Sequence, residues 1–181
     1  METEKEKHIV FIGAGSNIGN RKENLQQSIF MLAELPHTSI SGVSRIYHSE
    51  PLGMKEQDWF YNAVFQVLTT LSPQSLLNMC GTIEERLGRA KNHPKWIPRT
   101  LDLDLLYYDE IVWNDDNLVL PHPELPNRKF VLLPLLELAN PVHPVLKKTT
   151  AELLASCPDR SEISPLDEIE LIVPGGKGEG S

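Results

Sequence analysis

The stretch "IPRTLDLDLLYYDE", residues 97–110, places two acidic side chains inside what otherwise has the pattern of a buried strand. Alternate residues of a strand share a face, so the leucines point to one side while Asp102 and Asp104 point to the other. We expect the leucines in the core. Two carboxylates on the opposite face are costly unless cations meet them. The residues around this strand should therefore indicate which cation that is.

Asp102 and Asp104 have the spacing to hold a pair of divalent metal ions. Two residues of strand rise separate their Cβ atoms by roughly 6 to 7 Å, and such carboxylates lean together to hold two ions about 3.5 to 4 Å apart. Aspartate oxygens without a His or Cys cluster favour a hard ion, and Mg²⁺ usually takes one or two protein carboxylates together with phosphates and water. The alternative is a solvated sheet face without a ligand, because Asp-x-Asp is by itself a weak motif.

A group of basic residues lies just upstream, in a proline-punctuated segment that leads into the acidic strand: Arg89, Lys91, Lys95 and Arg99. Salt bridges to the aspartates would be the simpler interpretation, but this many cations exceed what two carboxylates need. A site that holds both metal ions and additional cations suits a polyphosphate, whose transfer is catalysed mainly by positioning and charge neutralisation. The stretch therefore favours a phosphoryl-transfer site.

The composition excludes several classes of protein. The chain has 181 residues, enough for one domain with a sizeable core, and Lys plus Arg total 17 against 25 Asp plus Glu, a net charge of -8. That charge disfavours a nucleic-acid binder. Cys80 and Cys157 lie far apart and form neither a zinc motif nor a disulfide framework. Because the sequence has no apolar signal region and no run long enough to span a membrane, we expect a cytoplasmic protein without a membrane partner.

Hydrophobic periodicity predicts an α+β fold. Strands are expected at residues 8–13, 39–48, 60–70 and 100–108, longer helices at 20–35 and 72–87, an apolar run at 117–120, and short helices at 132–139 and 150–155. The order strand, helix, strand, strand, helix, strand is the split βαβ pattern of a ferredoxin-like core, with a mainly antiparallel sheet and helices packed on it. Residues 8–160 are expected to form a single catalytic domain, between a flexible start at 1–7 and a mostly irregular C-terminal tail at 161–181.

Several segments together resemble the 6-hydroxymethyl-7,8-dihydropterin pyrophosphokinase family. They are GAGSNIGNRKENL (13–25), YHSEPLG (47–53), FYNAV (60–64), IEERLGR (83–89), PRTLDLDLL (98–106) and LPHPELPNRKFVLLPL (120–135). They occur in the family's order and with its spacing, over roughly residues 8–155. Each piece alone is unspecific, whereas the combination is highly specific.

The resemblance implies an enzyme of folate biosynthesis that transfers diphosphate from ATP to the hydroxymethyl group of 6-hydroxymethyl-7,8-dihydropterin and releases AMP. Asp102 and Asp104 would hold two Mg²⁺ ions that arrive with ATP. These ions would orient the phosphates and polarise the pterin hydroxyl for attack on the β-phosphorus. Arg89 and Arg99 would neutralise the phosphates, and Arg99 is the stronger candidate for the transfer step.

The resemblance also implies contacts for both substrates. Phe60 and Phe130 match the positions that sandwich the flat pterin, and Asn62 matches the amide that binds its edge. The further pterin-binding residues implied are Asn17, Ser49, Pro51, Leu52, Gly53 and Trp96. The ATP-binding residues implied are Glu84, Arg89, Lys91, Trp96, Arg99, His122 and Arg128.

The segment before the acidic strand departs from the family pattern. Lys91 stands where many relatives have arginine, Lys95 precedes Trp96 where arginine is common, and Ile97 replaces a glycine. In the family, Trp96 would belong to a loop that folds over the filled site and excludes water. Lysine lacks the bidentate fork of arginine, and a β-branched residue is stiffer than glycine. We expect loop closure or the grip on the nucleotide to differ here.

Other functions are open on the same residues. GAGSNIG (13–19) lies between a strand and a helix as a dinucleotide-binding loop does, but Ile18 stands where that fingerprint needs glycine, so the stretch is interpreted as a tight turn. Ferredoxin-like domains also serve as ligand-binding modules without chemistry. A Mg²⁺-dependent nucleotidyl or phosphoryl transferase with another acceptor is the second alternative. The products of turnover distinguish all three.

Overall fold

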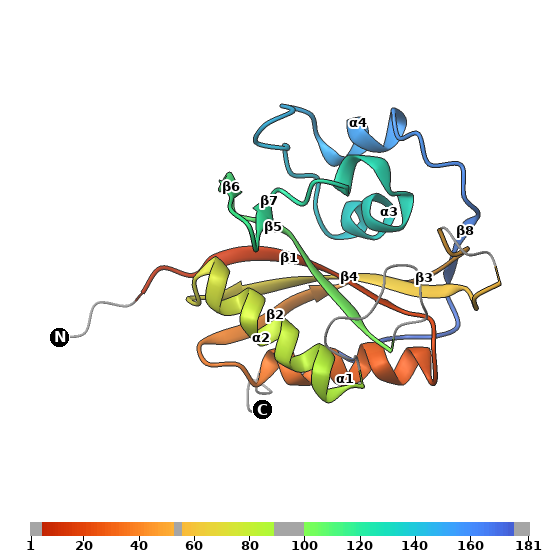
Figure 1. Ribbon diagram of the computed structural model, residues 1–181, viewed down its shortest axis with the longest axis horizontal. Coiled ribbons are helices and arrows are strands. Elements are labelled where there is room, and N and C mark those ends of the chain that lie inside the picture. Colours follow the sequence, from red (N-terminus) through yellow and green to blue (C-terminus); the bar gives the residue numbers. More distant parts are fainter. Residues whose placement is uncertain (1–4, 53–55, 89–99, 176–181) are drawn as a thin grey trace.

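An antiparallel sheet with helices on both of its faces makes up the computed structural model, which describes residues 5–52, 56–88 and 100–175 (Figure 1). In chain order the elements are β1 (His8–Ser16), α1 (Arg21–Ala33), β2 (Thr38–Val43), β3 (Ile46–Ser49), β4 (Phe60–Thr69), α2 (Pro73–Arg86), β5 (Asp102–Tyr108), β6 (Trp113–Asn114), β7 (Val119–Leu120), a 3-10 turn (Leu125–Asn127), α3 (Lys129–Leu138), α4 (Thr150–Ala155) and β8 (Ile163–Leu166). The predicted α+β class with a mainly antiparallel sheet is confirmed. None of the described helices is long and apolar enough to cross a membrane.

The main sheet has the order β5-β1-β4-β3-β8, and β2 also pairs with β4. The single strand predicted at 39–48 is two strands, because the chain breaks at Ser44. There the Ser44 amide donates to the carbonyl oxygen of Val64, and the Ser44 hydroxyl accepts the Val64 amide, each at 2.9 Å. As a result β2 pairs with one half of β4 and β3 with the other. Both halves of the strand predicted at 39–48 thus pair with β4.

The predicted starts of the two longer helices are confirmed by their caps. Asn20 Oδ1 accepts the amide of Glu23 at 3.0 Å at the start of α1, and Ser72 Oγ accepts the amide of Ser75 at 3.2 Å at the start of α2. Gly88 follows α2 with φ +103°, a left-handed conformation that ends the helix.

Helices cover both faces of the sheet (Figure 1), and a hydrophobic core lies on each side of it. On one face α1 and α2 pack against alternate residues of the strands, and this core includes the leucines of the acidic stretch, Leu101, Leu103 and Leu105. On the other face α3 and α4 pack against a smaller set that includes Phe11, Val64, Leu106 and Tyr107. The predicted burial of the leucines is therefore confirmed.

A bulge in β5 divides that strand into a polar and an apolar half. Leu105 pairs with Ile12 and Tyr107 pairs with Phe11, so Leu106 is an extra residue. The bulge changes the alternation, and Leu106 and Tyr107 join the core under α3. Asp102 and Asp104 precede it, on the stretch of that face which α3 leaves open.

The C-terminal segment adds an edge strand to the sheet. β8 pairs antiparallel with β3, from Ile46 opposite Leu166 to Ser49 opposite Ile163. The prediction of a mostly irregular tail did not include this strand, because a short strand that contains proline gives a weak local signal and is stable only at an edge. Part of the expected flexible start, residues 1–4, and the end of the expected irregular tail, residues 176–181, lie outside the described residues.

Candidate active site

A cavity of about 460 Å³ lies over the polar part of the sheet, beside the start of α3. It brings together ten of the residues predicted to bind substrates or metal: Ser49, Leu52, Phe60, Asn62, Glu84, Asp102, Asp104, His122, Arg128 and Phe130. Among the described residues, Asn17 and Pro51 do not line it. The predicted roles of Gly53, Arg89, Lys91, Trp96 and Arg99 fall outside the described residues. So do the departures noted at Lys95 and Ile97.

Two glycines on the central strand β1 create the space. Gly13 lies opposite Asp104 and Val64, and Gly15 lies opposite Asp102 and Asn62. Because β1 has no side chain at these two positions, the acidic residues of β5 and the amide of Asn62 on β4 face a common hollow. The interpretation of GAGSNIG as a tight turn was wrong for its first half, because both glycines lie in a strand. At Gly15 a Cβ would come within 2.8 Å of Asn62 Oδ1, so close approach of this side chain requires glycine there. The turn follows β1, where Gly19 has φ +70°.

The acidic pair is half-buried at one side of the cavity. The Asp104 side chain is 40% exposed, and its Oδ1 lies 4.0 Å from Nε2 of His122. Behind it, burial together with the charge of Asp104 raises the pKa of Cys80 to about 12, so that thiol stays neutral. Within the part of the chain that the structure describes, no group of three or more His, Cys, Asp or Glu side chains could hold a metal ion. Two carboxylates are a donor set that Mg²⁺ accepts, because phosphates and water usually complete its shell.

Glu84 supports the acidic strand from α2. Its side chain is buried, and its Oε2 accepts a hydrogen bond at 3.4 Å from the amide of Leu103, the residue between the two aspartates. Its position therefore ties α2 to the part of β5 that carries the acids. Its predicted contact with ATP stays a prediction.

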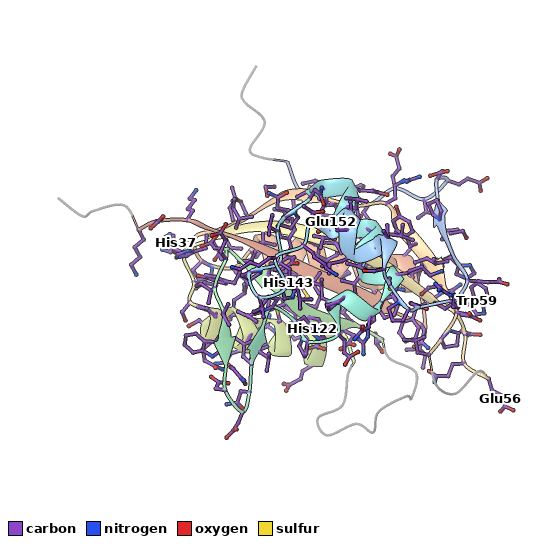
Figure 2. The ribbon with its side chains drawn as sticks, turned by 90° about the horizontal axis from the view of Figure 1, so that it is seen from above. His37, Glu56, Trp59, His122, His143 and Glu152 are labelled. Atoms are coloured by element: carbon purple, nitrogen blue, oxygen red, sulfur yellow. The ribbon has the colours of Figure 1, made fainter. Side chains whose placement is uncertain are left out.

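His122 is held as a neutral hydrogen-bond donor. Burial, and then the positive charge of Arg128, lower the pKa of His122, so the ring is uncharged at neutral pH. Its Nδ1 accepts the amide of Glu124 at 3.1 Å, which leaves the hydrogen on the Nε2 atom that faces Asp104. Figure 2, viewed from the α3 and α4 side, shows His122 over the middle of this face.

The other side of the cavity carries a fixed amide and two phenylalanines. Asn62 Nδ2 donates to Ser49 Oγ at 2.6 Å, and both side chains are buried. The carbonyl oxygen of this amide points toward Gly15. Phe60 begins β4, whereas Phe130 lies on α3 with the Arg128 guanidinium 5.6 Å from its ring centre. This half of the cavity suits a flat heterocycle with a polar edge.

Asn17 acts on the cavity through a loop. Its side chain is buried, and its Nδ2 donates to Gln57 Oε1 at 3.1 Å and to the carbonyl oxygen of Asp58 at 3.2 Å. Gln57 lines the cavity, and sequence reasoning did not select it. Asn17 therefore contacts a residue that lines the cavity, Gln57, but does not line the cavity itself.

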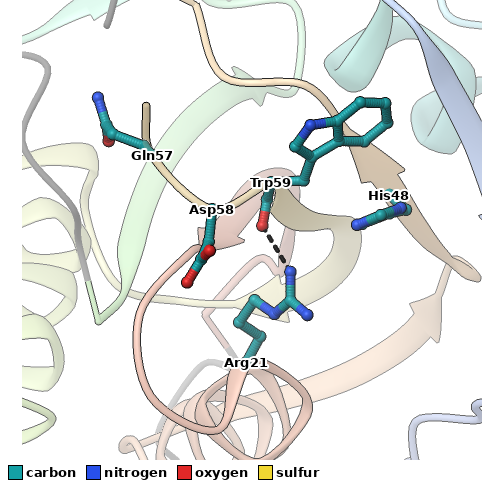
Figure 3. A pocket seen from close by; sticks show the side chains of 5 residues that line it. All are labelled: Arg21, His48, Gln57, Asp58 and Trp59. Atoms are coloured by element: carbon teal, nitrogen blue, oxygen red, sulfur yellow. Dashed lines mark hydrogen bonds between the residues drawn. The ribbon is translucent and has the colours of Figure 1, made fainter. Parts of the chain in front are cut away.

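A second hollow, of about 390 Å³, lies on the outer side of the same loop (Figure 3). Arg21 Nη1 donates to the carbonyl oxygen of Trp59 at 2.7 Å, and its guanidinium lies 4.1 Å from the ring centre of Tyr61. The His48 ring packs on Trp59 with 4.8 Å between centres. Burial, and then Arg21, lower the pKa of His48. These contacts hold Trp59, the residue directly before Phe60, in place. The residues around the second hollow therefore support the wall of the main cavity.

The 7,8-dihydro-6-hydroxymethylpterin-pyrophosphokinase (HPPK) family model matches residues 11–140. The chain belongs to the HPPK family. A 2-amino-4-hydroxy-6-hydroxymethyldihydropteridine pyrophosphokinase of Methylorubrum extorquens is 40% identical over 129 residues, which are 71% of this chain and 81% of that protein. The folic acid synthesis protein fol1 of Schizosaccharomyces pombe is 38% identical over 160 residues, 88% of this chain but only 22% of fol1. The chain thus spans a small part of some HPPK relatives.

The HPPK fold is found again among solved structures. The crystal structure of Plasmodium falciparum HPPK-DHPS superposes with a TM-score of 0.65 at 17% sequence identity, over 84% of this chain and 46% of that one. At this level of sequence identity, the structural similarity shows a shared fold only. The HPPK family match ends at residue 140, so α4 and β8 lie beyond it.

Proposed function

We propose that this chain transfers the β,γ-diphosphate of ATP to the hydroxymethyl group of 6-hydroxymethyl-7,8-dihydropterin, with release of AMP, as a step of folate biosynthesis. The observation that carries this proposal is the cross-strand row Asn62, Gly15, Asp102, which lines one cavity. Two strand spacings separate the amide from the carboxylate, roughly 10 Å between their Cα atoms. A pterin on the amide would reach the phosphates beside the acids.

The pterin would bind against Asn62, Phe60 and Phe130. Because Ser49 holds the Asn62 amide nitrogen, the amide carbonyl has a fixed direction and can accept hydrogen bonds from the pterin edge. The phenylalanines supply the apolar surface for the rings. Binding of this kind orients the hydroxymethyl group before reaction, which lowers the entropic cost of the transfer.

Asp102 and Asp104 would hold Mg²⁺ that arrives with ATP. The donor set fits, because Mg²⁺ needs only one or two protein carboxylates when phosphates and water complete its shell. The bound ions would supply charge neutralisation at the transferring phosphates and a more acidic pterin hydroxyl. Two ions, as the resemblance implies, match two carboxylates on one strand face.

His122 and Arg128 would contact the phosphates from the α3 side. Neutral His122 donates through Nε2, and Arg128 contributes a permanent positive charge. Arg89, Lys91, Trp96 and Arg99 remain proposed nucleotide contacts on the basis of the family resemblance. In the transfer, the pterin oxygen bonds to the β-phosphorus, the bond from that phosphorus to the α,β-bridging oxygen breaks, and AMP keeps this oxygen while the hydroxyl loses its proton.

Product analysis tests the proposal. Purified protein is incubated with ATP, Mg²⁺ and 6-hydroxymethyl-7,8-dihydropterin, and nucleotides and pterins are separated by chromatography. We expect equal amounts of AMP and pterin diphosphate. ADP would indicate transfer of a single phosphoryl group, and pterin binding without turnover would indicate a ligand-binding module, so either result contradicts the proposal.

A further inference from the structure

Residues 159–166, here named the C-terminal bracket, contact both walls of the cavity. The bracket lies beyond the region that the HPPK family model matches. One wall is the start of α3, which carries Arg128 and Phe130. The other is the end of β3 with Ser49 and Glu50.

Asp159 caps α3 from thirty residues further along the chain. Arg128 stands at the N-cap position of α3 but makes no capping bond with its side chain. Instead, Asp159 Oδ2 accepts the amide of Lys129, the first helical residue, at 3.0 Å. A carboxylate here satisfies an amide that has no partner within the helix, and its charge suits the positive end of the helix dipole. Arg128 and Phe130 flank this contact directly.

Asp159 is itself held in place by Ser161. The Ser161 amide and hydroxyl donate to Asp159 Oδ1 at 2.9 and 2.6 Å. Burial raises the pKa of Asp159, but the hydrogen bonds from Ser161 and Lys129 together lower it, so the group is ionised at neutral pH. The cap is therefore a fully charged, fixed carboxylate.

Glu162 joins the bracket to the other wall. Its amide donates to Glu50 Oε1 at 2.8 Å, and its carbonyl oxygen accepts the Glu50 amide at 3.2 Å. From there β8 continues along β3, with Ile163 opposite Ser49 (Figure 1). Ser49 is the residue that fixes the Asn62 amide. The bracket thus reaches the pterin-facing amide through one intermediate contact.

We propose that the C-terminal bracket sets the spacing between the two walls, and that Asp159 is a positioning residue for pterin binding. Asp159 and Glu162 are three residues apart, and a chain of that length spans at most about 10 Å. While both contacts hold, this short stretch of chain limits how far the α3 wall and the β3 wall can separate. This inference rests on the proposed function, because it concerns the pterin that the cavity is proposed to bind.

The test compares Asp159→Ala with Asp115→Ala. Asp115 is a matched control because its carboxylate, like that of Asp159, accepts two main-chain amides. These are the amides of Asn117 and Leu118, each 2.8 Å from Asp115 Oδ1, and they lie in the loop between β6 and β7. We measure pterin KM and kcat at saturating ATP, pterin Kd in the presence of α,β-methylene-ATP, and stability to urea. For Asp159→Ala we expect pterin KM and Kd to rise about three- to tenfold, the factor that corresponds to one lost cap. We expect kcat to change less, and Asp115→Ala to bind pterin like the wild type.

Ser161→Ala is a milder second variant, which keeps the Asp159 carboxylate and removes one bond to it. We expect a smaller rise in pterin KM and faster hydrogen exchange at the Lys129 amide, and this variant decides the question if Asp159→Ala does not fold. Equal pterin KM in wild type, Asp159→Ala and Ser161→Ala would overturn the bracket while leaving the proposed function intact. A wild-type protein that neither binds nor converts the pterin would instead contradict the proposed function.

Discussion

Gly15 lies directly opposite Asn62 in the β1–β4 pairing, and a Cβ on Gly15 would come within 2.8 Å of Asn62 Oδ1. The strand therefore needs glycine here so that the amide can face the cavity. The same backbone position separates the amide from Asp102 on the next strand. Removing this space provides a direct test of the pterin half of the site.

Gly15→Ala should weaken pterin binding by about tenfold, because the Asn62 amide must turn away and lose a hydrogen bond worth about 1 kcal/mol or more. Pterin KM at saturating ATP is the measurement. Gly81→Ala is the control, since a Cβ on Gly81 in α2 meets nothing within 4 Å. An unchanged pterin KM in Gly15→Ala would show that this amide does not contact the substrate.

Asp102→Asn and Asp104→Asn should each lower kcat by about 10² or more, the size of effect seen when one charge-stabilising group is lost. Both side chains are half-buried and belong to neither hydrophobic core, so the fold should persist. Turnover is measured against Mg²⁺ concentration, and folding by circular dichroism in metal-free buffer. Unfolding of both variants without metal would indicate a structural pair.

The free energy of unfolding should fall as the pH drops below about 6.5. Burial is the largest cause of the lowered pKa of His48, His122 and His143, whose ordinary value is 6.5. The unfolded chain therefore binds protons that the folded chain does not, and stability is lost from pH 6.5 down to the folded pKa values. Urea unfolding at pH 7.5 and 5.5 measures this.

His143 provides the matching variant for the pH experiment. Its Nδ1 accepts the amides of Val145 and Leu146 at 3.2 and 3.0 Å, which a proton on that nitrogen would displace. His143→Asn keeps an acceptor and does not titrate, so the loss of stability between pH 7.5 and 5.5 should be smaller. Equal stability of the wild type at both pH values would refute the prediction.

Arg21→Met should raise pterin KM about two- to fivefold. The substitution removes the hydrogen bond to the carbonyl oxygen of Trp59 and the contact with the Tyr61 ring, and these two residues are the sequence neighbours of Phe60. Lys22→Met changes the neighbouring cation on the same helix turn and should leave pterin KM at the wild-type value. The two variants are compared at saturating ATP. An identical pterin KM in the two variants would show that Arg21 does not support the pterin site.

Local patterns were sufficient to predict much of this fold. The helices predicted at 20–35 and 72–87 begin at the caps Asn20 and Ser72, and Gly88 follows the second; these features depend only on nearby residues. The alternation around Asp102 and Asp104 correctly assigned the leucines to the core, because a strand face is fixed by a period of two.

Features that depend on distant pairing were not predicted. The bulge at Leu106 arises from the register between β5 and β1, and β8 forms only because β3 offers it an edge. The role of Gly15 likewise requires knowing that Asn62 lies opposite. Sequence periodicity contains none of these registers, so GAGSNIG was interpreted as a turn and residues 161–166 of the bracket as part of an irregular tail.

A label on the β-phosphate of ATP shows directly whether the enzyme transfers diphosphate to the pterin. Wild-type protein is given ATP labelled with ³²P at the β position, together with Mg²⁺ and 6-hydroxymethyl-7,8-dihydropterin, and the products are separated. We expect all of the converted label in the pterin product and unlabelled AMP. Label in ADP would show transfer of the γ-phosphoryl group alone, and label in free diphosphate would show nucleotidyl transfer. Either result would rule out diphosphate transfer to the pterin.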